Sequence, residues 1–185
     1  LVLGDNIFYG HGLPEMLERA SLATTGGTVF GYHVSDPERY GVVGFDTNGR
    51  ANVIVEKPTD APSNYAVTGL YFLDERACEM AKQVIPSSRG ELEITSLLEI
   101  YLEEGSLNVE TMGRGIAWLD TGTHASMLDA SNFVRTLTER QGMQVGSPDE
   151  IAFRNGWITK AALRERAELY SKNDYGRFLA RLVDS

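Results

Sequence analysis

Apolar residues follow two spacings along the first part of the chain. Short runs rich in aliphatic and β-branched residues, ended by glycine, proline or asparagine, predict strands. These runs cover residues 1–4, 28–34, 42–46, 51–57, 66–74 and 106–113. Apolar positions at helical spacing predict helices at residues 13–24, 74–85 and 90–105. The Asn48-Gly49 pair, between two strand-like runs, predicts a tight hairpin.

The pattern becomes helical from His124 onward. Residues 124–143 predict one long helix, and residues 147–183 predict three shorter ones. Ser147 and Glu150 have the spacing of a capping box at the start of the first short helix. In the first part of the chain, strands alternate with helices, which favours a largely parallel, doubly wound sheet. We therefore expect an α/β fold with a mixed, mostly parallel sheet, helices on both of its faces and a helical C-terminal appendage.

The size and composition are those of an ordinary globular protein. The 185 residues favour one compact core, in which residues 1–142 form the sheet-containing part and residues 143–185 a helical extension packed on the same domain. We expect no membrane contact and a cytoplasmic location, since neither a spanning segment nor a signal peptide is recognised. The net charge of −9 argues against nucleic-acid binding. An anionic substrate would therefore need local cations or a metal.

Two aspartates follow apolar runs in the same way. Asp5 comes directly after residues 1–4, and Asp120 follows another apolar run and precedes a turn of small residues. In a doubly wound sheet, the carboxyl ends of the strands face the ligand. Both carboxylates could therefore meet at one cleft and hold Mg²⁺, which prefers oxygen ligands. An aspartate after a strand is also a common turn former or helix cap, and the spacing alone does not choose between these alternatives.

The middle of the chain offers groups for a phosphate and a sugar. Glu56 and Lys57 end a strand at Pro58 and could hold hydroxyl groups and a phosphate. Neighbouring residues of a strand point to opposite faces, which opposes a shared role unless the strand ends there, as the proline indicates. Gly41 could allow close approach of a ligand or serve a turn with positive φ. Arg89, before a predicted helix, could bind a phosphate or pair with an acid.

Several longer motifs occur in order through essentially the whole chain, namely GDNIFYGHG, DPERYGVVGFD, EKP, SNYAVTGLYFLD, GELEIT, WLDTGTHASMLDAS and QGMQVGSPDEIAFRNGWI. Taken together, they resemble one known family, the glucose-1-phosphate thymidylyltransferases. This resemblance implies a Rossmann-like nucleotidyltransferase fold, a homotetramer and Mg²⁺ as cofactor. It also implies that dTTP and glucose 1-phosphate are joined to give dTDP-glucose and pyrophosphate, a reaction of dTDP-rhamnose biosynthesis.

The resemblance implies roles for individual residues as well. Asp5 and Asp120 would hold the catalytic Mg²⁺, and Lys57 would complete the catalytic set by contacting the sugar phosphate. Substrate binding is implied for Gly41, Glu56, Lys57, Val67 and Arg89. A regulatory nucleotide site, where the dTDP-sugar end product inhibits, is implied for Tyr9, Gly10, Gly146, Glu150, Ile151 and Arg154.

Two departures and one absence accompany the resemblance. Gly44 and Ser96 stand where the family usually has glutamate and aspartate, both peripheral to the expected chemistry. The glycine-rich loop and the first strands of the family, which recognise thymine, would lie before Leu1, so we expect an N-terminally truncated chain that is inactive alone. Such a chain could instead be a non-catalytic remnant that binds a sugar phosphate or self-associates. It could also belong to a nucleotidyltransferase for another base or sugar.

Overall fold

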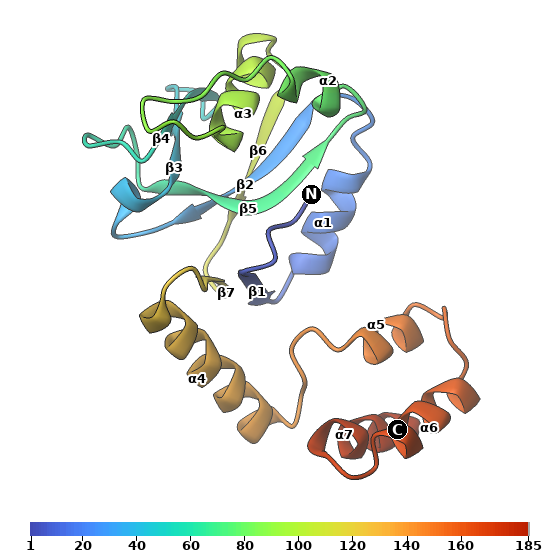
Figure 1. Ribbon diagram of the computed structural model, residues 1–185. Coiled ribbons are helices and arrows are strands. Elements are labelled where there is room, and N and C mark those ends of the chain that lie inside the picture. The colour runs from blue at the N-terminus through green and yellow to red at the C-terminus, as the bar shows by residue number, and fades with distance from the viewer. Residues whose placement is uncertain (185) are drawn as a thin grey trace. The chain divides into compact units, whose positions relative to one another are not determined.

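The computed structural model describes residues 1–184, which form two compact units (Figure 1). The first unit comprises residues 1–120, and the second begins at residue 121. This boundary lies earlier in the chain than the expected division after residue 142, because the long helix α4 (His124–Gln141) belongs to the second unit. Within residues 1–184, no helix combines the length and the apolar character needed to cross a membrane.

A five-stranded mixed sheet forms the centre of the first unit, with the strand order β4-β3-β5-β2-β6. The strands are β2 (Gly27–His33), β3 (Gly41–Phe45), β4 (Ala51–Glu56), β5 (Tyr65–Leu73) and β6 (Leu107–Met112). The mixed sheet is confirmed, but the expected predominance of parallel pairs is wrong. Among the described strands, β2 and β6 make the parallel pair and the other neighbours are antiparallel. A parallel pair needs a long crossover, so the short connection between β3 and β4 allows only antiparallel pairing of these two strands.

The predicted hairpin between β3 and β4 is confirmed. The Asp46 carboxylate accepts hydrogen bonds from the backbone N–H groups of Asn48 (2.8 Å) and Arg50 (2.9 Å). Gly49 has φ +77°, a conformation that side chains larger than hydrogen rarely adopt. The turn therefore brings the end of β4 beside the start of β3, where Glu56 pairs with Gly41.

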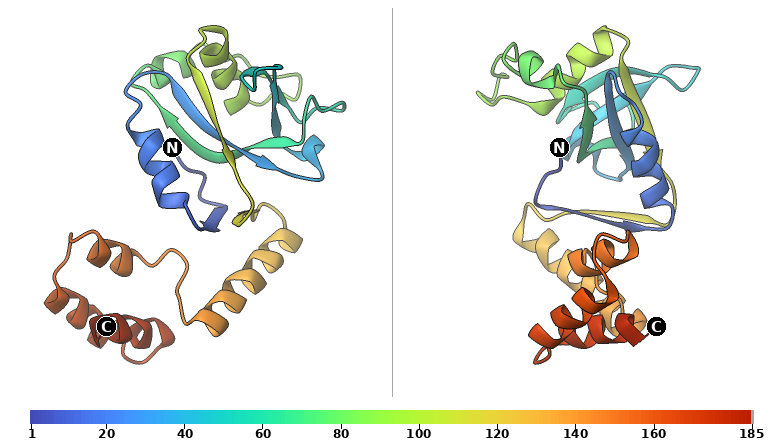
Figure 2. Two further views of the ribbon diagram at one scale, coloured as in Figure 1. Left: turned by 180° about the vertical axis from the view of Figure 1, so that it is seen from behind. Right: turned by 90° about the vertical axis from the view of Figure 1, so that its right-hand side faces the viewer.

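Helices cover both faces of this sheet, as expected. Successive residues of β2 point to opposite faces, and each face carries apolar side chains that pack against helices. Val29 packs with the α3 residue Leu98 in one core cluster, whereas Phe30 packs with the α1 residues Met16 and Ala20 in another. Helix α1 spans Leu13–Ser21, α2 spans Ala77–Ala81 and α3 spans Ile94–Glu103. Figure 2 (right) shows α1 and the α2–α3 pair on opposite sides of the strands.

A second, two-stranded ladder joins β1 (Asn6–Gly10) to β7 (Ile116–Asp120) in antiparallel orientation. The buried strand expected at residues 1–4 is wrong. Val2 makes a single bridge to Leu70 of β5, and residues Leu1 and Val2 are 68% and 59% exposed. The extended strand begins instead after Asp5, so this carboxylate precedes a strand and does not follow one.

The second unit contains α4 and three shorter helices, as predicted. These are α5 (Pro148–Arg154), α6 (Lys160–Leu169) and α7 (Asp174–Asp184), and α6 and α7 share a core around Leu163 and Leu179. Ser147 caps α5 by accepting a hydrogen bond from the N–H of Glu150. The Glu150 side chain bonds Arg154 at 2.7 Å, so the expected capping box is formed only on the serine side.

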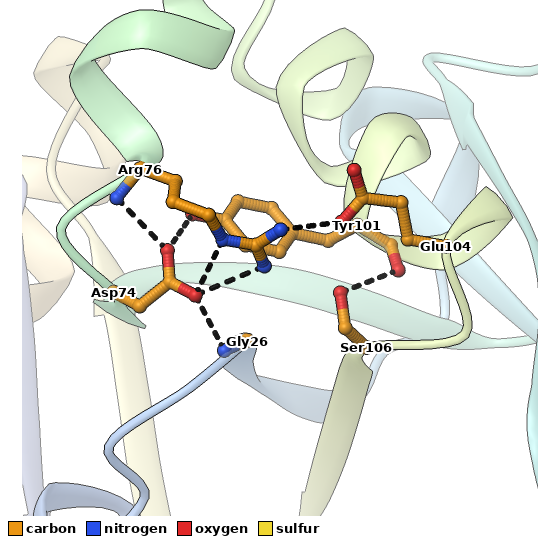
Figure 3. Close-up of polar contacts among 6 residues, drawn as sticks. All are labelled: Gly26, Asp74, Arg76, Tyr101, Glu104 and Ser106. Atoms are coloured by element: carbon orange, nitrogen blue, oxygen red, sulfur yellow. Dashed lines mark hydrogen bonds and ion pairs between the residues drawn. The ribbon is translucent and has the colours of Figure 1, made fainter.

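A carboxylate that follows β5 ties several elements of the first unit together (Figure 3). Asp74 accepts hydrogen bonds from the Gly26 N–H (2.6 Å), the Tyr101 hydroxyl (2.9 Å) and the guanidinium of Arg76 (3.0 Å). Arg76 also donates to Glu104 at 2.9 Å. Burial alone would raise the pKa of Asp74, but these donors outweigh burial and hold the pKa well below its usual range. Burial, and then the bond to Asp74, raises the pKa of Tyr101 to about 12.

Candidate active site

The β1–β7 ladder brings the two predicted metal-binding aspartates together. Its register pairs Asn6 with Asp120, so Asp5 lies at the same end of the ladder as Asp120. Both carboxylates line one cavity of about 230 Å³ in the first unit. The cavity is also lined by four other residues implied by the resemblance, namely Gly41, Glu56, Lys57 and Val67. Residues from β1, β3, β4, β5 and β7 therefore meet around one space.

The backbone at the end of β4 lets Glu56 and Lys57 face the same cavity. Within residues 1–184, Lys57 is the one residue other than glycine with a positive φ, +43°. Its N–H donates to the Tyr40 carbonyl oxygen at 2.9 Å, and its Nζ lies 3.9 Å from Glu56 Oε1. This left-handed conformation costs roughly 1–2 kcal/mol. It interrupts the alternation of side chains between the two faces of the strand. Glu56 and Lys57 can therefore serve the same site although they are neighbours in the sequence.

Close packing around Glu56 explains the glycine at position 41. Thr95 Oγ1, at the start of α3, donates to Glu56 Oε2 at 3.1 Å. A Cβ atom at Gly41 would lie 2.6 Å from Thr95 Cγ2 and 3.2 Å from Glu56 Oε2. Gly41 therefore serves close approach, and its φ is not in the positive range that a turn would require.

Aromatic residues form one wall of the cavity. The ring centres of Tyr40 and Trp118 lie 5.1 Å apart, and the Arg39 guanidinium lies 5.3 Å from the Tyr40 ring centre. Burial raises the pKa of Tyr40. Burial also raises the pKa of Tyr71 to about 12, and the charges of Glu56 and Asp5 make smaller contributions in the same direction. Both phenols therefore stay protonated at neutral pH.

Sequence reasoning missed several residues of this cavity. They are Asn6, Arg39, Tyr40, Tyr71, Thr95 and Trp118. Trp118 could have been found, because it lies two residues before Asp120 on a strand and therefore shares its face. Thr95 gave no local signal, since its role depends on the meeting of α3 with β4.

Other predicted site residues lie elsewhere. Arg89 pairs with Glu91 and, at 3.5 Å, with Glu93, and it is not among the residues that line the cavity. Tyr9 and Gly10 lie in β1, opposite Ala117 and Ile116. The remaining regulatory candidates lie in the second unit, around α5: Gly146, Glu150, Ile151 and Arg154. Their implied roles stay predictions.

Comparison with known proteins shows where the chain belongs. Residues 1–136 match the family model described as nucleotidyl transferase. Over 183 residues, the chain is 56% identical to the glucose-1-phosphate thymidylyltransferase of Xanthomonas campestris pv. campestris and 54% identical to that of Neisseria meningitidis. Each match covers 99% of this chain but only 62% and 64% of the relative. The chain thus spans less than two thirds of the length of these curated relatives.

Solved structures agree with this assignment. A Bacillus anthracis protein described as a candidate glucose-1-phosphate thymidylyltransferase, in complex with a sucrose, is 39% identical with a TM-score of 0.63, over 72% of this chain and 53% of that one. A UDP-glucose pyrophosphorylase in complex with UDP-glucose is 25% identical with a TM-score of 0.63, over 73% of this chain and 55% of that one. The expected nucleotidyltransferase fold is confirmed, and the chain belongs to the nucleotidyl transferase family.

Proposed function

We propose that this chain carries the sugar-phosphate and metal-binding part of an enzyme that joins dTTP and glucose 1-phosphate, giving dTDP-glucose and pyrophosphate. The observation that carries the proposal is the convergence of Asp5, Asp120, Glu56 and Lys57 on one cavity. The names of the curated relatives support the choice of reaction. The cavity supplies both charge signs that a phosphorylated sugar and a metal ion require.

The donor atoms of the cavity fit Mg²⁺. Within residues 1–184, no group of three or more histidine, cysteine, aspartate or glutamate side chains is arranged to hold a metal. Two carboxylates, Asp5 and Asp120, suit Mg²⁺ because this ion keeps several waters and takes further oxygens from substrate phosphates. When bound there, Mg²⁺ would neutralise charge shared by the nucleotide and the sugar phosphate.

The other residues of the cavity would bind and orient the sugar phosphate. Lys57 would offset the repulsion between the attacking phosphate oxygen and the triphosphate. Glu56, held by Thr95, would accept hydrogen bonds from sugar hydroxyl groups, and Gly41 and Val67 would shape the pocket. Arg89 would need to leave its acidic partners to reach a phosphate. The nucleophile belongs to the substrate, so no protein side chain needs to form a covalent intermediate.

The proposed reaction is tested with the product of the complete gene that encodes this sequence. Pyrophosphate release is measured with glucose 1-phosphate and Mg²⁺, using dTTP or UTP as the nucleotide. We expect release with dTTP that depends on the sugar phosphate, and no release from any nucleotide would contradict the proposal. Faster release with UTP would favour a different base, which the 25% identical UDP-glucose pyrophosphorylase makes a specific alternative. The 185-residue chain is assayed in parallel, and binding of glucose 1-phosphate without turnover would favour the alternative of a non-catalytic remnant that binds a sugar phosphate.

Assembly and regulation of the enzyme are further parts of this proposal. Light scattering of the complete gene product is expected to give the mass of a homotetramer. Inhibition by added dTDP-sugar is expected to weaken when residues of the proposed regulatory site are replaced by alanine. The side chains to replace are those of Tyr9, Glu150, Ile151 and Arg154.

Replacement of Lys57 by alanine is expected to raise KM for glucose 1-phosphate by about 10- to 100-fold, because a charge-assisted contact contributes roughly 1.5–3 kcal/mol. Steady-state kinetics with varied sugar phosphate measure the effect. Lys82→Ala is the matched control, since Lys82 lies just after α2, is paired with Glu79 and has a side chain that is 69% exposed. Equal KM values for Lys57→Ala and its parent would remove the role assigned to Lys57.

The strained backbone at Lys57 predicts a separate effect on stability. Lys57→Gly and Lys57→Ala both remove the amine, but only glycine adopts a φ of +43° without strain. We expect Lys57→Gly to unfold with a free energy about 1 kcal/mol higher than Lys57→Ala. Urea unfolding followed by circular dichroism measures this difference. If the alanine variant were as stable as the glycine variant, the backbone would not be strained there.

A further inference from the structure

The Asn6 side chain connects three strands at the edge of the cavity. Its Oδ1 accepts hydrogen bonds from Trp118 Nε1 on β7 (2.6 Å) and from the Gly69 N–H on β5 (3.1 Å). Its Nδ2 donates to Asp5 Oδ1 at 2.9 Å. The Asn6 amide therefore links the Asp5 carboxylate to β5 and β7, two strands whose residues line the same cavity.

The surroundings of Asn6 leave its amide a single orientation. Two N–H donors face Oδ1, so a rotated amide would set its own NH₂ against both of them. Gly69 permits this packing, because a Cβ atom there would lie 2.7 Å from Asn6 Oδ1 and 2.9 Å from Nδ2. Gly69 lies where the pairing of β5 with β2 shifts, between the partners of Val29 and Gly31. The β5 backbone thus leaves room for the amide and supplies one of its donors.

We propose that Asn6 is a positioning residue that acts through Asp5. Asn6 donates to Asp5 Oδ1 from a fixed amide, and Asn6 is paired with Asp120 in the β1–β7 register. Asn6 therefore fixes the position of the Asp5 carboxylate relative to Asp120. This inference rests on the proposed function, in which Asp5 and Asp120 act on one metal ion. Misplacement of a reacting or ligating group by about 1 Å costs as much as 10²-fold in rate.

A double-mutant cycle tests the proposal in the complete gene product. Asn6→Ala is expected to lower kcat by about 10- to 100-fold in the parent but by less than about twofold in an Asp5→Asn background, since its effect passes through Asp5. An equal loss in both backgrounds would overturn the positioning role. If Asp5→Asn itself left kcat unchanged, the proposed function would fail first, so the two failures are distinguishable.

Asn6→Asp is the second variant, in case Asn6→Ala does not fold. It keeps an acceptor oxygen for Trp118 and Gly69 but sets a charged carboxylate oxygen against Asp5 Oδ1 in place of the donor, so at least the same loss of kcat is expected. Asn64→Asp is the matched control, because Asn64 also donates from its amide, but to the Val34 carbonyl oxygen outside the cavity. Parental kcat for Asn6→Asp would overturn the proposal.

Crystal structures of the parent and of Asn6→Ala or Asn6→Asp supply a readout that does not depend on activity. The Asp5 carboxylate is expected to rotate or shift when the Asn6 donor is removed, while the β1–β7 register is kept. Superposable Asp5 carboxylates in parent and variant would overturn the proposal.

Discussion

An Asp120→Asn variant is expected to lose about two to three orders of magnitude in turnover while keeping its fold. The substitution removes one negative charge and leaves the side chain nearly the same in size. Asp120 ends β7 and lies, with Asp5, at one end of the ladder that borders the cavity. With only one carboxylate left to hold Mg²⁺, the charge that develops between nucleotide and sugar phosphate is less well neutralised. Pyrophosphate release under saturating substrates measures the loss.

The matched control for this experiment is Asp60→Asn. Asp60 is exposed, belongs to the same unit and does not line the cavity. Its replacement is expected to leave turnover unchanged, and circular dichroism should show parental folds for both variants. Equal turnover of Asp120→Asn and its parent at saturating Mg²⁺ would end the assignment of Asp120 as a metal ligand.

Much of the fold could be predicted because its elements depend on local spacing. The Asn48-Gly49 turn and the helical spacing around Leu98 are signals within one element, and both elements form where expected. The direction of strand pairing is not a local property. Strands β2 and β6 are parallel neighbours in the sheet, although β3, β4 and β5 lie between them in the chain. Residues 1–4 have the composition of a buried strand, yet the one bridge they make leaves them exposed.

The candidate site was predictable to a similar extent. Asp5 and Asp120 follow apolar runs, and that pattern was sufficient to propose that they share a cleft, although Asp5 actually precedes its strand. The joint orientation of Glu56 and Lys57 depends on the left-handed backbone of Lys57. The following proline predicted the end of the strand but not this conformation, because a proline favours an extended residue before it. The role of Asn6 could not be predicted from residue spacing, because its partners Gly69 and Trp118 are distant in the sequence and lie next to it only in the folded chain.

Replacement of Asp74 by asparagine is expected to destabilise the first unit, with a drop in melting temperature on the order of 10 °C, the scale of several lost buried hydrogen bonds. The Asp74 side chain is only 5% exposed and accepts bonds from Gly26, Arg76 and the fully buried Tyr101. An asparagine keeps one acceptor oxygen but sets its NH₂ group against donors and leaves the Arg76 charge less compensated. Differential scanning calorimetry measures the shift, with Asp60→Asn again as the exposed control.

The same carboxylate makes stability depend on pH in a direction that can be checked. The pKa of Asp74 is held below its unfolded value of about 3.9, so its contribution is complete above about pH 5 and is lost as pH falls through the unfolded and then the folded pKa. The difference in unfolding free energy between the parent and Asp74→Asn is therefore expected to shrink between pH 6 and pH 3. Urea unfolding at several pH values measures it. A difference that stayed constant over this range would show that the ionised carboxylate is not what Gly26, Arg76 and Tyr101 stabilise.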